Sequence, residues 1–291
     1  MPAWATPLLF IGPTFLLLGL LVVFPLAFSL WHSFQQWDLQ LGPQPMGFVG
    51  FRNYVQIVEN PLFWDAIRFT VWFALVAVFL ELVLGVMIAL LLDQRLPGVM
   101  AVRALIILPT AVSPIIAGLM FRYLLYPGTG LIAYILQLLG MNVPATGVLG
   151  SSHWAPFGIG LTTIWEWTPF VALVVLAGIQ SIPTEMVEAA RVDGAGSVRL
   201  FLKIILPNLR FVLSIAVLIR LMQTFNIFSP IYAETHGGPG IATTSASYLL
   251  YQNGLLYYNL GMTFAMQWVI VACVLTIVNA AVWLAFRGIE L

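Results

Sequence analysis

The sequence predicts an all-α integral membrane protein with about six transmembrane helices. Hydrophobic residues make up 61% of the chain and charged residues only 8%, and the mean hydropathy is +1.01. Soluble domains carry about 25% charged residues, so this chain cannot be solvated as a globule. A spanning helix needs about 20 apolar residues. Runs of that kind occupy approximately residues 8–31, 69–92, 104–125, 156–179, 211–232 and 263–286, and we treat residues 1–291 as one domain.

Local features refine two of these runs and one connection between them. The first run, 8–31, is too long and too poor in N-terminal basic residues for a cleaved signal peptide, so we expect it to stay as the first span. The third run contains Pro109 and Pro114, which predicts a kink near mid-membrane. Residues 126–154 are rich in Gly and Pro and hold no cation, which indicates a loop with one short helix near 131–139.

Several function classes are excluded by composition. The net charge is zero, and no basic patch exists to neutralise phosphates, so we expect no nucleic-acid partner. Cys273 is the only cysteine and cannot pair within the chain. His32, His153 and His236 lie far apart in predicted loops, so we expect no metal site. No phosphate-cradling Gly-x-x-x-x-Gly-Lys occurs, so the chain should not bind ATP, and we expect no cofactor in it.

Residues 181–210 predict two short helices joined by a bend. Glu185 lies in the first turn of the first helix, where an acid is favourable. That helix should end at or near Gly194, because glycine tolerates the left-handed conformation of a helix end. Ser197 can cap a second helix. Its apolar stripe consists of Val198, Phe201, Leu202 and Ile205.

The same segment resembles the EAA signature of the membrane subunits of ATP-binding-cassette importers. The positions that fit its spacing are Glu188, Ala189, Ala190, Gly194, Ile204, Leu206 and Pro207. The resemblance implies a type I importer transmembrane domain, in which residues 181–210 form the coupling-helix loop that docks on a cytoplasmic ATPase. The coupling residues that it implies are Glu188, Ala189, Ala190, Asp193, Gly194, Phe201 and Pro207. It also implies a short interfacial helix between the first two spans. The alternative is an amphipathic connector that lies on the membrane surface.

The distribution of cations predicts the orientation. With both termini cytoplasmic, the inside connections hold Arg95, Arg103, Arg191, Arg199, Lys203, Arg210 and Arg287. The outside connections hold only Arg52, Arg68 and Arg122. This bias puts residues 181–210 in the cytoplasm, and we expect a multi-pass protein of the bacterial cytoplasmic (inner) membrane.

Three ionisable residues are predicted near the middle of the membrane. Counting about 1.5 Å per residue places Glu81, Glu166 and Arg220 at a similar depth. Such groups are costly in lipid and are therefore functional candidates. Two interpretations stay open: Arg220 forms an ion pair with Glu81 or Glu166 that only pins helices, or one of the three lines a solute path.

Aromatic and amide side chains extend this candidate path. Trp165 and Trp167 flank Glu166, and Phe170 follows one turn later. Indole faces suit the apolar face of a sugar ring, and a carboxylate accepts hydrogen bonds from its hydroxyls. Pro169 is expected to interrupt the helix locally.

The fifth run adds two amides, Gln223 and Asn226, and Asn226 matches a position at the solute site of the family's maltose-type subunit. The alternative is that the tryptophans contact lipid or the core and that the amides join helices.

The resemblance implies the permease subunit of an importer for a carbohydrate or related solute, working by alternating access. It would pair with a second homologous permease subunit, two ATPase subunits that hold ATP and Mg, an extracytoplasmic solute-binding protein and membrane lipid. Arg220 leaves an anionic sugar derivative open as the solute. Alternatives from other classes are an ATPase-independent secondary transporter or channel and a structural scaffold; a secondary transporter tends to show inverted repeats, which are not evident.

Overall fold

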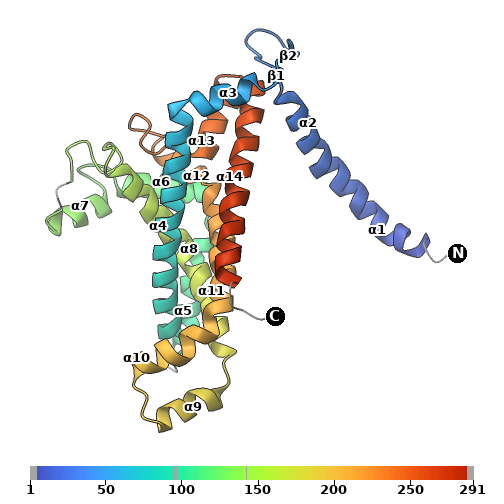
Figure 1. Ribbon diagram of the computed structural model, residues 1–291. Coiled ribbons are helices and arrows are strands. Elements are labelled where there is room, and N and C mark those ends of the chain that lie inside the picture. The colour runs from blue at the N-terminus through green and yellow to red at the C-terminus, as the bar shows by residue number, and fades with distance from the viewer. Residues whose placement is uncertain (1–4, 95–96, 142, 287–291) are drawn as a thin grey trace. The chain divides into compact units, whose positions relative to one another are not determined.

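The computed structural model describes residues 5–94, 97–141 and 143–286, and most of these residues are helical (Figure 1). Two of the cations predicted to be cytoplasmic, Arg95 and Arg287, lie outside the described residues. The chain divides into two compact units, one made of Met1–Trp64 and Leu249–Cys273 and the other of Asp65–Tyr248 and Val274–Leu291.

The first unit begins with a long apolar helical run. Its parts are α1 (Ala5–Leu18), the π-helical turn η1 (Gly19–Val23) and α2 (Phe24–His32). Residues 10–32 are long and apolar enough to span a membrane, in agreement with the predicted first span. Pro13 lies inside α1 without ending it.

The rest of the first unit is a small group of short elements joined by hydrogen bonds. Its elements are the antiparallel strands β1 (Gln35–Gln36) and β2 (Gly47–Phe48), helix α3 (Arg52–Glu59), the π-helical turn η4 (Gln252–Leu256) and the start of α14 (Leu260–Phe286). The Asn53 side-chain amide donates to the carbonyls of Ser33 and Gln35 at 2.8 and 3.0 Å, which ties α3 to the chain before β1. Helix α3 occurs where a short helix was expected.

The second unit contains most of the long helices. They are α4 (Pro61–Leu92), α5 (Val99–Ile106), the 3₁₀ turn η2 (Leu108–Ala111), α6 (Pro114–Leu124), α7 (Leu131–Leu138), α8 (Ala155–Gln180), α9 (Thr184–Val192), α10 (Ser197–Leu200), the π-helical turn η3 (Phe201–Ile205), α11 (Leu206–Phe225), α12 (Ser229–Glu234) and α13 (Ala246–Tyr251). Helix α7 matches the short helix predicted near residues 131–139.

Five helices among the described residues are long and apolar enough to cross a membrane. A sixth span results if the bent pair 99–111 and 114–124 is counted as one. The predicted kink in the third run is in fact a break of 96°. Val112 and Ser113 adopt extended conformations directly before Pro114, which disfavours a helical residue in front of it.

Two predicted details of the other spans were wrong. Helix α8 continues through Pro169, so this proline does not interrupt it. The fifth span was predicted at 211–232, but the helical run extends from Ser197 to Phe225, and α12 follows as a separate helix. The run passes through Pro207 because the π-helical turn η3 precedes it and Pro207 occupies the first turn of α11.

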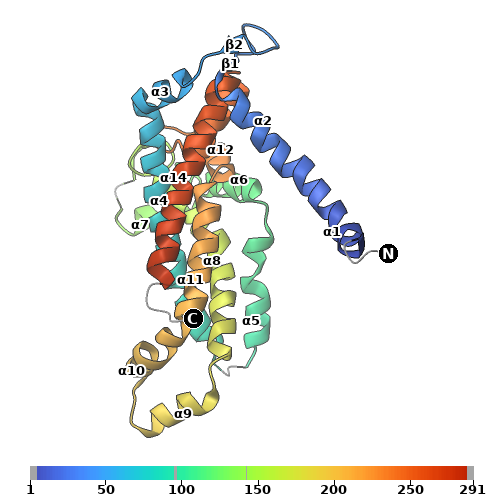
Figure 2. The same ribbon diagram turned by 45° about the vertical axis from the view of Figure 1, so that its right-hand side comes forward.

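Small residues allow the helices of the second unit to approach closely. Helices α4, α8 and α11 share a core that includes Ala89, Val175 and Leu209. A Cβ on Gly85 would lie 2.6 Å from Val171, so α4 contacts α8 only because this residue is glycine. Helices α9 and α10 lie at one end of α8 and α11, and α12 lies at their other end (Figures 1 and 2).

Candidate functional site

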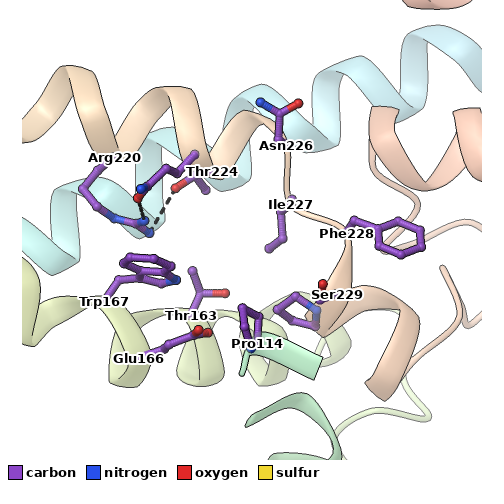
Figure 3. A pocket seen from close by; sticks show the side chains of 12 residues that line it. Pro114, Thr163, Glu166, Trp167, Arg220, Thr224, Asn226, Ile227, Phe228 and Ser229 are labelled. Atoms are coloured by element: carbon purple, nitrogen blue, oxygen red, sulfur yellow. Dashed lines mark hydrogen bonds between the residues drawn. The ribbon is translucent and has the colours of Figure 1, made fainter. Parts of the chain in front are cut away.

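A cavity of about 130 Å³, lined by both polar and apolar side chains, lies between the end of α11, the middle of α8 and the start of α6. Helix α8 contributes Thr163, Glu166 and Trp167, which recur at positions i, i+3 and i+4 and therefore share one face. The break before α6 brings Pro114 to the wall, and the turn between α11 and α12 adds residues 226–230. Figure 3 shows Glu166 and Trp167 facing the side of α11 that carries Arg220 and Thr224.

The Arg220 guanidinium is held by a buried ion pair. Its Nε and Nη2 donate to the two carboxylate oxygens of Glu81 at 2.7 and 2.9 Å. The Arg220 side chain is 1% exposed and that of Glu81 0% exposed. Arg220 therefore pairs with Glu81 rather than with Glu166, which decides between the two pairings left open by the sequence.

Three further groups fix the orientation of Arg220. Nη1 donates to Gln223 Oε1 at 2.6 Å, and Nη2 donates to Thr224 Oγ1 at 3.3 Å. The guanidinium carbon lies 4.4 Å from the centre of the Trp167 ring, a cation–π distance (Figure 3). The ion pair therefore joins α4 to α11, and the ring contact joins α11 to α8.

Glu166 is buried beside this network and is incompletely satisfied. It is 1% exposed and lines the cavity. Its Oε2 atom has no hydrogen-bond partner among the described residues. A buried carboxylate oxygen without a donor is rare and costly, and this one belongs to a side chain in the wall of the cavity.

The structure brings together only part of the predicted solute path. Glu166, Trp167, Gln223 and Asn226 line the cavity. Trp165 and Phe170, also predicted for the path, do not line this cavity. Trp165 packs against Phe121 with ring centres 5.5 Å apart. Phe170 packs against the core shared by α4, α8 and α11, one turn closer to the end of α8.

Sequence reasoning did not assign Pro114 and Thr163 to the candidate path, and both also line the cavity. The i−3 spacing of Thr163 from Glu166 could have indicated it. The positions of Pro114 and Ser229 depend on the break before α6 and on the early end of α11, which the sequence did not reveal.

Glu234, at the end of α12, is a third buried acid, and sequence reasoning missed it. It is 4% exposed, and Thr162 on α8 donates to its Oε1 at 2.7 Å. Its Oε2 has no partner among the described residues. Burial raises the pKa of Glu234 to about 8, and the hydrogen bond from Thr162 opposes this shift.

The bend predicted at residues 181–210 is a well-formed helix end. Gly194 has φ +79°, the left-handed region that favours glycine. The backbone N–H of Ala195 donates to the carbonyl of Ala190 at 2.9 Å, and that of Gly194 donates to the carbonyl of Arg191 at 3.0 Å. These two bonds form a Schellman motif with Gly194 as its left-handed residue.

The segment from α9 to α10, which we call the elbow, exposes most of the predicted coupling residues. Within the elbow, Glu188, Ala189, Asp193 and Gly194 are exposed and Ala190 is half-buried. Beyond it, Phe201 in η3 is half-buried and Pro207 at the start of α11 is exposed. Apolar side chains are exposed beside them: Val192 is 88% exposed and Val198 is 73% exposed. Val192 ends α9 and Val198 lies at the start of α10, so the turn between the two helices carries apolar as well as charged side chains at its surface.

These features define a mostly helical membrane protein with a cavity among its spanning helices and a two-helix elbow at one end of them, which is the architecture of a transport subunit. The family model for the "binding-protein-dependent transport system inner membrane component" matches residues 81–287. The chain belongs to this family, which comprises membrane subunits of ATP-binding-cassette importers.

Curated relatives cover most of the chain. The probable ABC transporter permease protein y4oQ of Sinorhizobium fredii is 32% identical over 98% of this chain and 91% of its own length. The trehalose/maltose transport system permease protein MalF of Thermococcus litoralis is 38% identical over 87% of this chain and 83% of its own length. The sulfoquinovosyl glycerol transport system permease protein SmoG of Agrobacterium fabrum is 34% identical over 87% of this chain and 81% of its own length.

Solved structures show the same fold. A chain of a bacterial ABC transporter that imports the acidic polysaccharide alginate has a TM-score of 0.82 at 22% identity, covering 96% of this chain and 94% of that chain. This likeness confirms the predicted fold class, an importer transmembrane domain with about six spans.

Proposed function

We propose that this chain is the permease subunit through which an ATP-driven importer moves a carbohydrate or related solute across the bacterial cytoplasmic membrane. One observation carries the proposal: the segment with the spacing of the coupling signature folds as an exposed elbow at one end of the spanning helices α8 and α11. Relatives named for trehalose, maltose and sulfoquinovosyl glycerol support the solute class.

The partners follow from the same reasoning. A second homologous permease subunit covers the open side of the cavity, where Gln223 and Asn226 are exposed. Two ATPase subunits, which hold ATP and Mg, dock on the elbows, and an extracytoplasmic binding protein delivers the solute. A complex between the alginate transporter and its pentasaccharide-bound periplasmic protein supports this last assignment.

In this mechanism the chain transmits motion and performs no covalent chemistry. Closure of the ATPases moves the elbows, and because the elbow continues without interruption into α11, its displacement reaches the cavity at the other end of that helix. The termini and the elbow are cytoplasmic in this proposal, in accordance with the cation bias.

The test is reconstitution in proteoliposomes. The complete importer should take up solute only with ATP, and Glu188→Lys should abolish uptake while the permease still assembles with its partner permease. Asp65→Lys, at an exposed acid outside the elbow, is the matched control and should leave uptake intact. Uptake by the permease subunits alone, without ATPase or nucleotide, would refute the proposal in favour of a secondary transporter or channel.

A further inference from the structure

Glu234 is a buried acid that the proposed transport mechanism does not use. It is the last residue of α12 and lies outside the spanning helices. Thr162 on α8 donates to its Oε1 at 2.7 Å, and its Oε2 is buried without a hydrogen-bond partner among the described residues. Buried polar atoms without partners are few in native structures, so this one calls for an explanation.

The carboxyl group lies in a close-packed joint between α12, α6 and α8. A Cβ added to Gly118 on α6 would lie 2.8 Å from the Cβ of Ala233 and 3.3 Å from the Cα of Pro230. Thr162 is 0% exposed and Glu234 is 4% exposed. Water is therefore kept from this carboxyl as long as α12 packs against α6 and α8.

Among the described residues, no cation is placed to balance an ionised Glu234. From α6, Arg122 donates its Nη1 to the backbone carbonyl of Ala233 at 3.3 Å and forms no described ion pair with Glu234. On α8 the nearby titratable residue, Glu166, is itself an acid, and in the loop after α12 His236 is exposed. Burial raises the pKa of Glu234 to about 8, so the packed joint holds the protonated acid at neutral pH.

The joint is connected to the cavity through two elements. Residues 226–230 line the cavity, and α12 begins within them. On α8, Thr163 lines the cavity and is the chain neighbour of Thr162, which contacts Glu234. A displacement of α12 from α8 therefore changes the cavity wall and also exposes Glu234 to water.

We propose that Glu234 is a proton-binding site that couples the cavity wall to the extracytoplasmic pH: its protonated form holds α12 against α6 and α8, and separation of α12 releases the proton. The O–H bond of the acid breaks, the proton passes to water, and the carboxylate takes a proton back when the joint closes. Release and uptake occur on the same side, so no proton is carried across the membrane. That this side is extracytoplasmic rests on the proposed function, since α12 lies at the end of α8 and α11 opposite the elbow (Figures 1 and 2).

Raising the pH should favour separation of α12. In the packed joint the pKa of Glu234 is about 8, whereas the ordinary value for a hydrated glutamate is 4.5. The packed state therefore binds the proton more tightly than the separated state. Between these two values, the equilibrium should shift toward separation by up to about tenfold per pH unit. Glu234→Gln stays neutral at every pH and should remove this shift.

Hydrogen exchange of the backbone amides of residues 229–236, measured by mass spectrometry on the complete importer in nanodiscs, reports separation of α12. The wild type and Glu234→Gln are compared at each pH, so that the intrinsic pH dependence of exchange cancels. The ratio of wild-type to variant exchange rates should rise by up to about tenfold per pH unit between about pH 5.5 and 7.5. The amide keeps an acceptor for Thr162, so the variant should still assemble with its partner subunits.

Glu59→Gln is the matched control, because Glu59 is an exposed glutamate outside the joint, and it should behave like the wild type. A ratio that does not change with pH would overturn the proposal. Loss of the pH effect in Glu59→Gln as well as in Glu234→Gln would also overturn it, because the effect would then not belong to the joint.

A second measurement tests whether this separation belongs to the transport cycle. ATPase activity stimulated by the binding protein is measured for the same two proteins, and the ratio of wild type to Glu234→Gln should rise with pH over the same window. A flat ratio would overturn the coupling of the proton site to the cavity wall during transport. Solute uptake without ATP would instead refute the importer function and leave the exchange result, which needs no ATP, standing.

Discussion

Replacing Glu81 by Gln leaves the Arg220 guanidinium buried without its counter-charge, and we expect this change to destabilise the helix bundle strongly. The two carboxylate contacts are 2.7 and 2.9 Å long, and both side chains are almost fully buried. At an effective dielectric constant of about 20, two charges about 4 Å apart attract by ~4 kcal/mol. Removing one partner of such a buried pair costs about 3–5 kcal/mol.

A double-mutant cycle measures this interaction. The variants are Glu81→Gln, Arg220→Met and the double replacement, and unfolding of the purified permease in detergent micelles is followed by tryptophan fluorescence. Each single change should cost about 3–5 kcal/mol. The double change should cost much less than their sum, because an apolar pair needs no counter-charge. Single changes below about 1 kcal/mol, or additive costs, would show that the ion pair does not hold α4 to α11.

Three other changes test separate parts of the structure. Gly194→Ala places a side chain at φ +79° and should reduce solute transported per ATP, with a cost of about 1 kcal/mol to the elbow, whereas Gly196→Ala, at φ −67°, should not. Gly85→Ala puts a Cβ 2.6 Å from Val171 and should lower stability by about 1–3 kcal/mol in thermal unfolding. For Glu234, the folded pKa of about 8 exceeds the ordinary value of 4.5, so the unfolded chain releases its proton first. Stability should therefore fall by up to about 1.4 kcal/mol per pH unit as pH rises from 4.5 to 8, and Glu234→Gln should remove this slope in denaturant titrations.

Each of these three changes has a result that would contradict the explanation given for it. Equal losses in the two glycine variants of the elbow would mean that the left-handed bend is not the cause. A pH slope that persists in Glu234→Gln would assign it to another group. Normal stability in Gly85→Ala would show that α4 and α8 separate freely at this contact.

Much of the fold was predictable because lipid imposes simple rules on a sequence. Apolar runs of about 20 residues indicate spanning helices, and this rule indicated the helical runs without tertiary information, although the bounds of the fifth differ and the third is broken. The left-handed end at Gly194 was predictable too, because glycine is the residue that best tolerates it. The sharp break before Pro114 was not, since a proline in a spanning helix is compatible with anything from a mild kink to a full break.

The candidate site was predictable in composition and less so in geometry. Polar and charged residues at membrane depth indicated Glu166, Arg220 and Gln223, because such groups need partners or a function. The choice of Glu81 as the partner of Arg220 depends on how α4 packs against α11, and spacing along the chain carries no information about that. That Trp165 does not line the cavity has a similar cause: it packs against a core formed with residues of α6 and α7.

The location of the elbow is the central claim, and cysteine accessibility measures it most directly. Cys273 is the only cysteine, so Cys273→Ser provides a background in which Glu188→Cys is the sole thiol. A membrane-impermeant maleimide should label this thiol in inside-out vesicles and not in right-side-out ones, and a short bifunctional crosslinker should join it to the ATPase subunit with a yield that changes on ATP binding. Labelling from the outer face, or a crosslink to the ATPase from another loop and none from the elbow, would contradict the account.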